Sequence, residues 1–333
     1  MDTTPQPKQD STCTDYGYIF NEGTPLAEAF HFGDGNTGGH YTLDEYNNIM
    51  ACLTSDEFTI NSDMISEYHN IGTSYQGRPI YAIKLSDNPD DNEINEPKIL
   101  FTGLHHAREP MSMQSLLYTQ FHLIEQYGQD SDVTALLNNR ELWFISMVNP
   151  DGYEFNINYF DNDSSYGLHR KNMNDTESCG NDNIGVDLNR NYGVNFGDTS
   201  GASANPCSYT YHGLSAFSEP ETQAVRDFVW LHEFDIALNY HSYGNLLIHQ
   251  PNTIPLSNNC TTNADNCYTL SSSFWDTYLT IGQEILSDND YILGSDIETV
   301  GYSVAGDSDA WMTLYGNSPN TITEENLMYV FTP

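Results

Sequence analysis

Two neighbouring histidines and a glutamate stand directly after an apolar run in the stretch KILFTGLHHAREP. The apolar run ends at Leu104, and His105, His106 and Glu109 follow it. Imidazole nitrogens and carboxylates are ligands of catalytic zinc, which uses sets such as two histidines and one glutamate and keeps one position open. A tight turn could aim His106 and Glu109 at one point. The stretch therefore predicts half of a metal site.

The other half has to come from elsewhere in the chain. A second predicted strand, in the stretch FDIALNYH, ends at His241. In open α/β sheets the active crevice lies beyond the carboxyl ends of the strands. We therefore expect His241 to join His106 and Glu109 at one edge of a sheet.

Strands and helices alternate along the chain, which predicts an α/β fold. Helical spacing follows Thr42 and Ser218, which form potential capping boxes with Glu45 and Glu221. The predicted helices cover about residues 43–53, 111–127, 220–232 and 270–286. The predicted strands cover residues 78–85, 98–104, 142–148, 234–241 and, as the last candidate, 320–326. The motif NPDG after residue 148 predicts a turn, and residues 160–210 predict a long functional loop.

The composition excludes several classes of protein. Hydrophobic residues make up 38% of the 333 residues, enough for a packed core, so the chain is not a disordered acidic one. The net charge of −37 excludes nucleic acid as a partner. The apolar runs are too short to span a membrane. Six cysteines favour disulfides and secretion. The amino end has no apolar signal segment, so we expect a mature form whose export signal is missing or removed.

Several short motifs follow one another in a fixed order. They are GLHHARE, VNPDGYEF, HRKN, GVDLNRNYGVNFG, PCSYTYHGLSAFSEPE, NYHSYGNLLIHQP and GYSVAGDSDAW. From about residue 40 to the carboxyl end, the chain resembles the pancreatic type of zinc carboxypeptidase, the metallocarboxypeptidase family. The resemblance implies a single α/β domain at 40–333 with a central mixed β-sheet flanked by helices, the carboxypeptidase-like (phosphorylase/hydrolase-like) architecture. Residues 1–39 then form an irregular amino-terminal arm.

The resemblance also assigns the reaction and its metal. It implies hydrolysis of the C-terminal peptide bond of peptides or proteins, with one zinc ion (Zn²⁺) per chain. His106, Glu109 and His241 match the zinc ligands, the set known from carboxypeptidase A, and His105 falls outside it. Arg170 in HRKN matches the arginine that stabilises the oxyanion developing on the scissile carbonyl.

Further motif residues match the family's substrate-binding positions. Asn189 and Arg190 match the clamp on the terminal carboxylate, for which a guanidinium fork is suited. Tyr302 matches the mobile tyrosine that closes over this carboxylate, and Arg108 and Tyr243 match flanking subsites. We expect a monomer that binds neither nucleic acid nor membranes.

The family's general base comes from a T-x-E pattern in the last strand, and here two glutamates compete. Thr323-x-Glu325 satisfies the pattern and places both side chains on one strand face. Glu324 instead matches the commoner spacing back to Trp311. We predict Glu325 as the base, with Glu324 as the alternative.

The pocket for the last substrate side chain is predicted to be acidic. Asp309 matches the pocket-base position that is acidic in Lys/Arg-specific members, and Asp307 adds a second acid. Ile297 falls where such members have a small residue, which would favour a narrower pocket or mixed specificity. Alternatively, Asp307 and Asp309 only add to the acidic surface or bind calcium. Structural Ca²⁺ in the stretch SDNPDDNE also stays open.

The resemblance implies a disulfide between Cys179 and Cys207. It leaves the partners of the other four cysteines open, and one compatible arrangement joins Cys13 to Cys52 and Cys260 to Cys267. Three other functions are weighed against a secreted, basic-specific carboxypeptidase. They are a related zinc amidohydrolase, a catalytically inactive peptide-binding module on the same scaffold, and a purely structural acidic protein.

Overall fold

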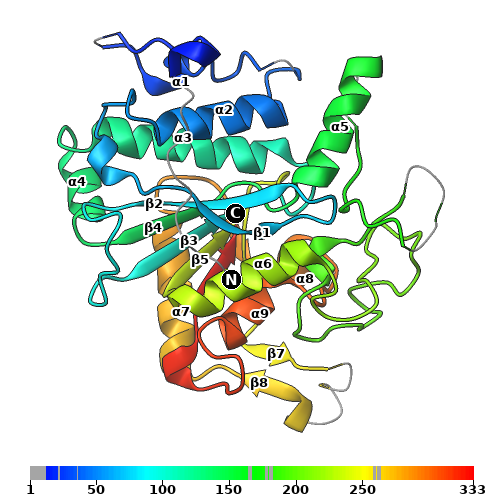
Figure 1. Cartoon of the computed structure of the whole chain (residues 1–333). Coiled ribbons are helices and arrows are strands. Elements are labelled where there is room, and N and C mark those ends of the chain that lie inside the picture. The colour runs from blue at the N-terminus through cyan, green and yellow to red at the C-terminus, as the bar shows by residue number, and fades with distance from the viewer. Residues whose placement is uncertain are drawn as a thin grey trace.

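The computed structural model describes residues 13–21, 23–35, 37–163, 167–176, 179, 183–257, 260 and 264–333. A twisted sheet runs through the centre of the molecule, with helices on both of its faces (Figure 1). Helices α2 and α3 cover one face, and α6 and α9 lie on the other. This arrangement confirms the predicted α/β domain with a central mixed sheet.

Within the described residues, the central sheet has eight strands in the order β1-β2-β4-β3-β5-β10-β6-β9. The inner strands run parallel to one another, in the pairs β4–β3, β3–β5 and β5–β10. The pairs β1–β2, β2–β4 and β10–β6 are antiparallel. The strands are β1 His69–Thr73, β2 Pro79–Leu85, β3 Lys98–Thr102, β4 Glu141–Ile145, β5 Ile236–Asn239, β6 Leu246–His249, β9 Ile292–Gly294 and β10 Tyr329–Thr332. Strands β7 Thr253–Pro255 and β8 Cys267–Thr269 form a separate antiparallel pair.

The helices connect these strands and bury apolar faces against them. The α-helices are α1 Leu26–Ala29, α2 Leu43–Leu53, α3 Pro110–Gln126, α4 Ser131–Leu137, α5 Pro150–Asp163, α6 Pro220–His232, α7 Ser272–Ile285, α8 Asp296–Thr299 and α9 Ser308–Tyr315. The 3-10 turns are η1 Cys13–Tyr16, η2 Ser62–Met64, η3 Leu188–Arg190, η4 Ala264–Asn266 and η5 Glu324–Asn326. None of the described helices is long and apolar enough to cross a membrane.

Strand β4 shows how the centre of the sheet packs against helices on both faces. Leu142 and Phe144 pack into the core cluster that includes α2 and α3. Trp143 and Ile145 point the other way, into the cluster that includes α6. Because helices cover both faces, every residue of β4 is buried, as is typical of parallel strands.

The local helix signals were partly right. Thr42 and Glu45 form the expected capping box at the start of α2. The capping box predicted for Ser218 and Glu221 is wrong, because Glu219 is the N-cap of α6 and makes no side-chain cap bond. Tertiary partners take the two groups instead: Ser218 Oγ accepts from Asn191 Nδ2, and Glu221 Oε1 accepts from the backbone N–H of Tyr75.

The turn predicted for NPDG is also wrong, because this motif starts helix α5. Asn149 Oδ1 accepts a hydrogen bond from the N–H of Gly152, which satisfies a free donor of the first turn. Pro150 fits at the start of the helix because the missing N–H of proline would have no partner there.

The last strand lies later in the chain than predicted. Residues 320–326 form no strand, and Glu324 to Asn326 form the exposed turn η5. The strand is β10, whose Val330 and Phe331 are fully buried. Burial against β5 and β6 favours this apolar segment over the polar one before it.

The described part of the amino-terminal segment packs onto the core. Tyr18, Leu26 and Phe30 belong to the same cluster as α2 and α3. The structure contains the disulfides Cys13–Cys52, Cys179–Cys207 and Cys260–Cys267, and the first of these joins the segment to α2. The expected Cys179–Cys207 pairing is thereby confirmed.

Candidate active site

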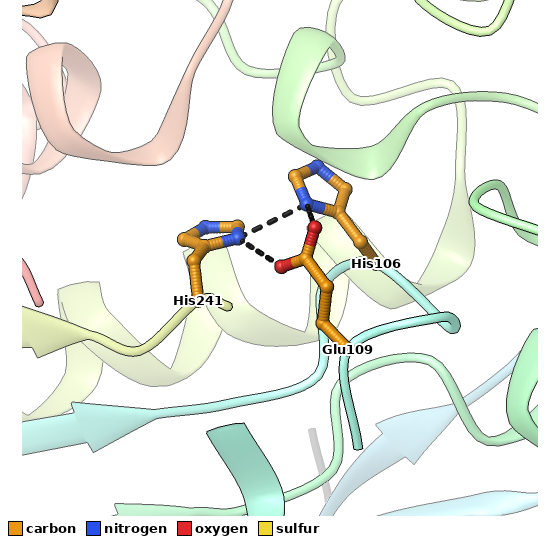
Figure 2. A group of neighbouring side chains, drawn as sticks. All are labelled: His106, Glu109 and His241. Atoms are coloured by element: carbon orange, nitrogen blue, oxygen red, sulfur yellow. Dashed lines mark hydrogen bonds and ion pairs between the residues drawn. The ribbon is translucent and has the colours of Figure 1, made fainter. Parts of the chain in front are cut away.

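His106, Glu109 and His241 meet at the carboxyl edge of the parallel strands. His106 and Glu109 follow β3, and Glu109 is the N-cap of α3. His241 follows β5, which pairs with β3 in parallel, Thr102 opposite Asn239. The two loops therefore leave the sheet side by side. Figure 2 shows the three side chains pointing toward one another.

Three electron-pair donors converge in this cluster. His106 Nδ1 lies 2.9 Å from Glu109 Oε1, and His241 Nδ1 lies 2.9 Å from Glu109 Oε2. The two Nδ1 atoms are 3.0 Å apart. Ligands of a tetrahedral zinc ion, at about 2.0–2.1 Å from the metal, lie about 3.3 Å from one another. A small outward shift would fit the three donors to zinc, and a cation would also resolve the close approach of the two imidazole nitrogens.

A buried aspartate that the sequence analysis did not single out supports His106 from behind. Asp187 Oδ1 lies 3.2 Å from His106 Nε2. A carboxylate behind a metal-binding histidine fixes the orientation of its ring. Asp187 Oδ2 accepts a hydrogen bond of 2.9 Å from Arg170 Nε. The available signal was its position in the DLNRN motif, two residues before Asn189.

The charges around this cluster favour ionised carboxylates. Burial opposes ionisation of Asp187, but the guanidinium groups of Arg170 and Arg190 outweigh it and hold its pKa well below the usual range. Burial likewise opposes ionisation of Glu109, and the two histidines at its oxygens lower its pKa well below the usual range. Both groups are therefore anionic, and Glu109 is the one whose oxygens lie with the two histidine nitrogens, where a cation could bind.

His105 is not one of the three converging groups, although its ring centroid lies 5.8 Å from that of His241. The Nε2 of His105 lies 2.9 Å from the hydroxyl of Tyr192, and the side chain is fully buried. Burial lowers its pKa well below the usual value, so the ring is neutral. The structure thus separates the two adjacent histidines, as the motif implied.

A cavity of about 170 Å³ opens beside the three donors. Its lining includes most of the residues predicted to bind substrate, namely Asn189, Arg190, Tyr243, Tyr302 and Asp309, together with Glu109 and His241. Tyr243 is fully exposed and Tyr302 about half exposed, so both stand at the mouth. The cavity therefore joins the metal-binding groups to the predicted clamp.

The clamp residues are held rigidly. Arg190 is buried, and its Nε and Nη1 donate to the carbonyls of Gly201 and Asn189. Asn189 Oδ1 accepts from the backbone N–H of Ser308 at 2.9 Å, and its Nδ2 lies 3.3 Å from His241 Nε2. The turn η3 and the start of α9 thus fix the clamp beside His241.

Arg108 and Glu325 do not line this cavity. Arg108 is exposed, and its guanidinium lies over the ring of Tyr209. Glu325 is exposed on η5, before the amino end of β10. Because β10 is parallel to β5, Tyr329 opposite Ile236, Glu325 lies at the sheet edge opposite to that of His241.

The structure therefore places neither Glu325, the predicted general base, nor the alternative Glu324 at the cavity. Glu324 is on the same exposed turn, where its Oε1 accepts a hydrogen bond from Ser271. The T-x-E pattern requires a strand, and these residues form none. The carboxyl end of β10 does enter the cavity, at Thr332 and Pro333.

A second group of acids lies in the loop after β2. Oxygens of Asp87, Glu93 and Glu96 come within 4.8 Å of one another. The loop overlaps the stretch considered for calcium, and calcium there stays a prediction.

Comparison with known proteins identifies the family. The sequence model of the zinc carboxypeptidase family matches residues 54–328. The chain belongs to the zinc carboxypeptidase family. It is 33% identical to mouse carboxypeptidase A2 over 231 residues, covering 69% of this chain and 50% of that protein. It is 36% identical to bovine carboxypeptidase A1 over 217 residues, covering 64% of this chain and 47% of that protein. The chain thus spans about half the length of these relatives.

Two solved structures share the fold. Thrombin-activatable fibrinolysis inhibitor superposes with a TM-score of 0.68 at 24% identity, over 90% of this chain and 67% of that one. Carboxypeptidase A from Helicoverpa armigera gives 0.63 at 26% identity, over 88% of this chain and 64% of that one. The architecture predicted from the motifs is therefore that of the family.

Proposed function

We propose that this chain forms the catalytic domain of a secreted zinc carboxypeptidase that removes the C-terminal residue of peptides or proteins. The observation that carries the proposal is the cavity whose lining includes Glu109 and His241, two of the three convergent metal-binding groups, together with Asn189 and Arg190. A metal site alone fits many hydrolases. A buried arginine beside it adds a means of recognising a free carboxylate.

Each residue then has a distinct task. Zinc held by His106, Glu109 and His241 would supply a Lewis acid that polarises a carbonyl group and makes water a better nucleophile. Arg170, whose Nη1 lies 3.8 Å from Glu109 Oε1, stabilises negative charge on the scissile carbonyl oxygen. Arg190 and Asn189 bind the terminal carboxylate, Tyr302 closes over it, and Tyr243 contributes a flanking subsite.

The reaction also needs a group that takes a proton from water and returns it to the leaving amine. Glu324 and Glu325 cannot do this from the opposite edge of the sheet. Since β10 enters the cavity at Thr332 and Pro333, a base carried by this strand must stand at its carboxyl end.

The cavity supports a preference for C-terminal Lys or Arg. Asp296, Asp307 and Asp309 all line it, and the last two are buried. Ile297, which argued for a narrower pocket, instead lines a neighbouring cavity of about 430 Å³. Acidic walls favour a cationic side chain and disfavour an apolar one.

A catalytically inactive peptide-binding module is the second candidate. The observation in its favour is that neither predicted base reaches the cavity. A zinc amidohydrolase that ignores the terminal carboxylate is less compatible, because Asn189 and Arg190 are positioned beside the metal-binding groups.

Release of C-terminal Arg and Phe from matched N-blocked dipeptides tests the proposal. We expect zinc-dependent release that a chelator abolishes and added zinc restores, faster for Arg, and no release from dipeptide amides. Binding of the Arg dipeptide without release from the zinc-loaded protein would indicate the binding module. Equal cleavage of the dipeptides with a free C-terminal carboxylate and of the dipeptide amides would indicate the amidohydrolase.

Secretion and the monomeric state are part of the same proposal. Three disulfides support an oxidising compartment. Size-exclusion chromatography with light scattering should give the mass of one chain, and a stable dimer would contradict the monomer.

A further inference from the structure

The acidic cavity wall contains three aspartates that differ in how their oxygens are used. Asp309 Oδ1 accepts from Asn239 and Ser308, and its Oδ2 accepts from the hydroxyl of Thr332. Both oxygens of this carboxylate are therefore engaged by the protein. Its hydrogen bonds connect α9 to β5 and β10, which is a structural task.

Asp296 is engaged in a similar way. Its Oδ1 accepts from the backbone N–H of Ile297, and its Oδ2 accepts from that of Val304, both at 2.8 Å. This carboxylate thus ties α8 to the segment that leads into α9.

Asp307 is different, because among the described residues no other residue donates a hydrogen bond to one of its oxygens. Oδ2 accepts from the N–H of Ala310 at 2.9 Å and from Gln250 Nε2 at 3.2 Å, so it serves as the N-cap of α9. Within the described residues, no hydrogen bond from another residue reaches Oδ1, and no ion pair neutralises the carboxylate. Yet the residue is only 6% exposed and lines the cavity.

A buried carboxylate with an open oxygen and no cation is costly unless a ligand supplies the cation. The guanidinium of Arg190 favours the charged form of Asp307, but burial and the charge of Asp296 oppose it, and Arg190 forms no ion pair with Asp307 among the described residues. Asp307 lines both this cavity and the neighbouring one, as do Gln250, Asp296 and Val304. It therefore lies on the wall between the two cavities. A long side chain entering the first cavity would meet it there.

We infer that Asp307 is the residue that makes the ionic contact with a Lys or Arg side chain at the substrate's C-terminus, while Asp309 holds the pocket wall in place. This inference rests on the proposed function and refines its specificity. It assigns the ionic contact with the substrate side chain to Asp307, whereas the family motif indicates Asp309.

The test isolates charge from shape by comparing arginine with citrulline, its neutral near-isostere. Kinetics use N-blocked dipeptides ending in either residue, and calorimetry measures binding of free L-arginine and L-citrulline to the zinc-loaded protein. We expect the wild type to prefer arginine by about 100-fold or more, as for a buried charge pair. Asp307→Asn should reduce that ratio to less than about fivefold.

Two matched variants complete the experiment. Asp309→Asn and Asp296→Asn remove one charge each from the same wall and should keep most of the preference, although Asp309→Asn is expected to unfold at a lower temperature. Asparagine remains a good N-cap, and Asp307→Ser is a second capping variant without charge if Asp307→Asn is poorly folded.

The outcomes separate the two proposals. An Asp307→Asn or Asp307→Ser protein that keeps the arginine preference overturns the inference, as does a loss of preference in Asp309→Asn alone. Discrimination in binding without any hydrolysis would support the inference and refute the enzymatic proposal. A wild type that binds both amino acids equally would overturn the inference even if the dipeptides are cleaved.

Discussion

The imidazole of His106 is held between a metal-facing glutamate and a buried aspartate: its Nε2 lies 3.2 Å from Asp187 Oδ1. Its other nitrogen lies 2.9 Å from Glu109 Oε1. Nδ1 therefore lies on the side of Glu109 and His241, and Nε2 on the side of Asp187. Asp187 in turn is fixed by Arg170, so that the same carboxylate positions a proposed ligand and a proposed catalytic cation.

Substitution of Asp187 by asparagine should weaken zinc binding by about 10- to 100-fold, because loss of the carboxylate behind a ligating histidine lowers its basicity and frees its ring. Competition with a chromogenic chelator measures this affinity. Asp151→Asn is the matched control, since Asp151 is an equally buried aspartate that pairs with Arg78. Equal zinc affinity in wild type and Asp187→Asn would contradict the positioning role.

Arg170→Met should lower kcat by about 100- to 1,000-fold while changing KM little, because the guanidinium is proposed to act on charge that develops only in the transition state. Steady-state kinetics on the preferred dipeptide give both constants. Arg170→Lys retains a charge without the fork and should recover part of the lost turnover. A rise in KM with unchanged kcat would instead assign Arg170 to substrate binding.

Replacement of Glu325 by glutamine should leave kcat and KM within about twofold of wild type, as is usual for exposed positions away from a site. The structural reason is that η5 lies at the other edge of the sheet. Glu324→Gln is the parallel control. If turnover by Glu325→Gln instead fell by about two orders of magnitude with zinc still bound, Glu325 would be restored as the base. Residues 323–327 would then have to follow a different path.

Glu221 should make the protein less stable as the pH rises. Burial raises the pKa of this carboxyl to about 7, although the N–H of Tyr75 and the amide of Asn172 donate to it. Between about pH 4.5 and 7 the folded state keeps a proton that the unfolded state has lost, so the free energy of unfolding falls with rising pH, by up to about 3 kcal/mol from this group.

Urea unfolding of wild type and Glu221→Gln at several pH values measures this effect. The variant should gain stability relative to wild type from pH 4.5 to 7 and show a constant difference above that range. Glu284→Gln, an exposed carboxyl on α7, should run parallel to wild type. If the pH dependence of the free energy of unfolding were the same for Glu221→Gln and wild type, Glu221 would ionise normally in the folded protein.

Local patterns determined much of the fold. Helical periodicity with Thr42 and Glu45 predicted α2, and apolar runs predicted β2 to β5, because these signals depend on residues a few positions apart. Two local signals gave wrong predictions because contacts with other residues compete with them. Ser218 pairs with Asn191 and Glu221 with Tyr75, and NPDG starts a helix capped by Asn149.

The sequence by itself determined which residues converge on the metal position, because His106, Glu109 and His241 follow parallel strands whose carboxyl ends must share one edge. Only the tertiary structure decided the rest. It placed Asp187 behind His106, moved Glu324 and Glu325 to the far edge, and left one oxygen of Asp307 open while engaging both oxygens of Asp309. Such distinctions depend on contacts between segments far apart in the chain, and no spacing along the sequence records them.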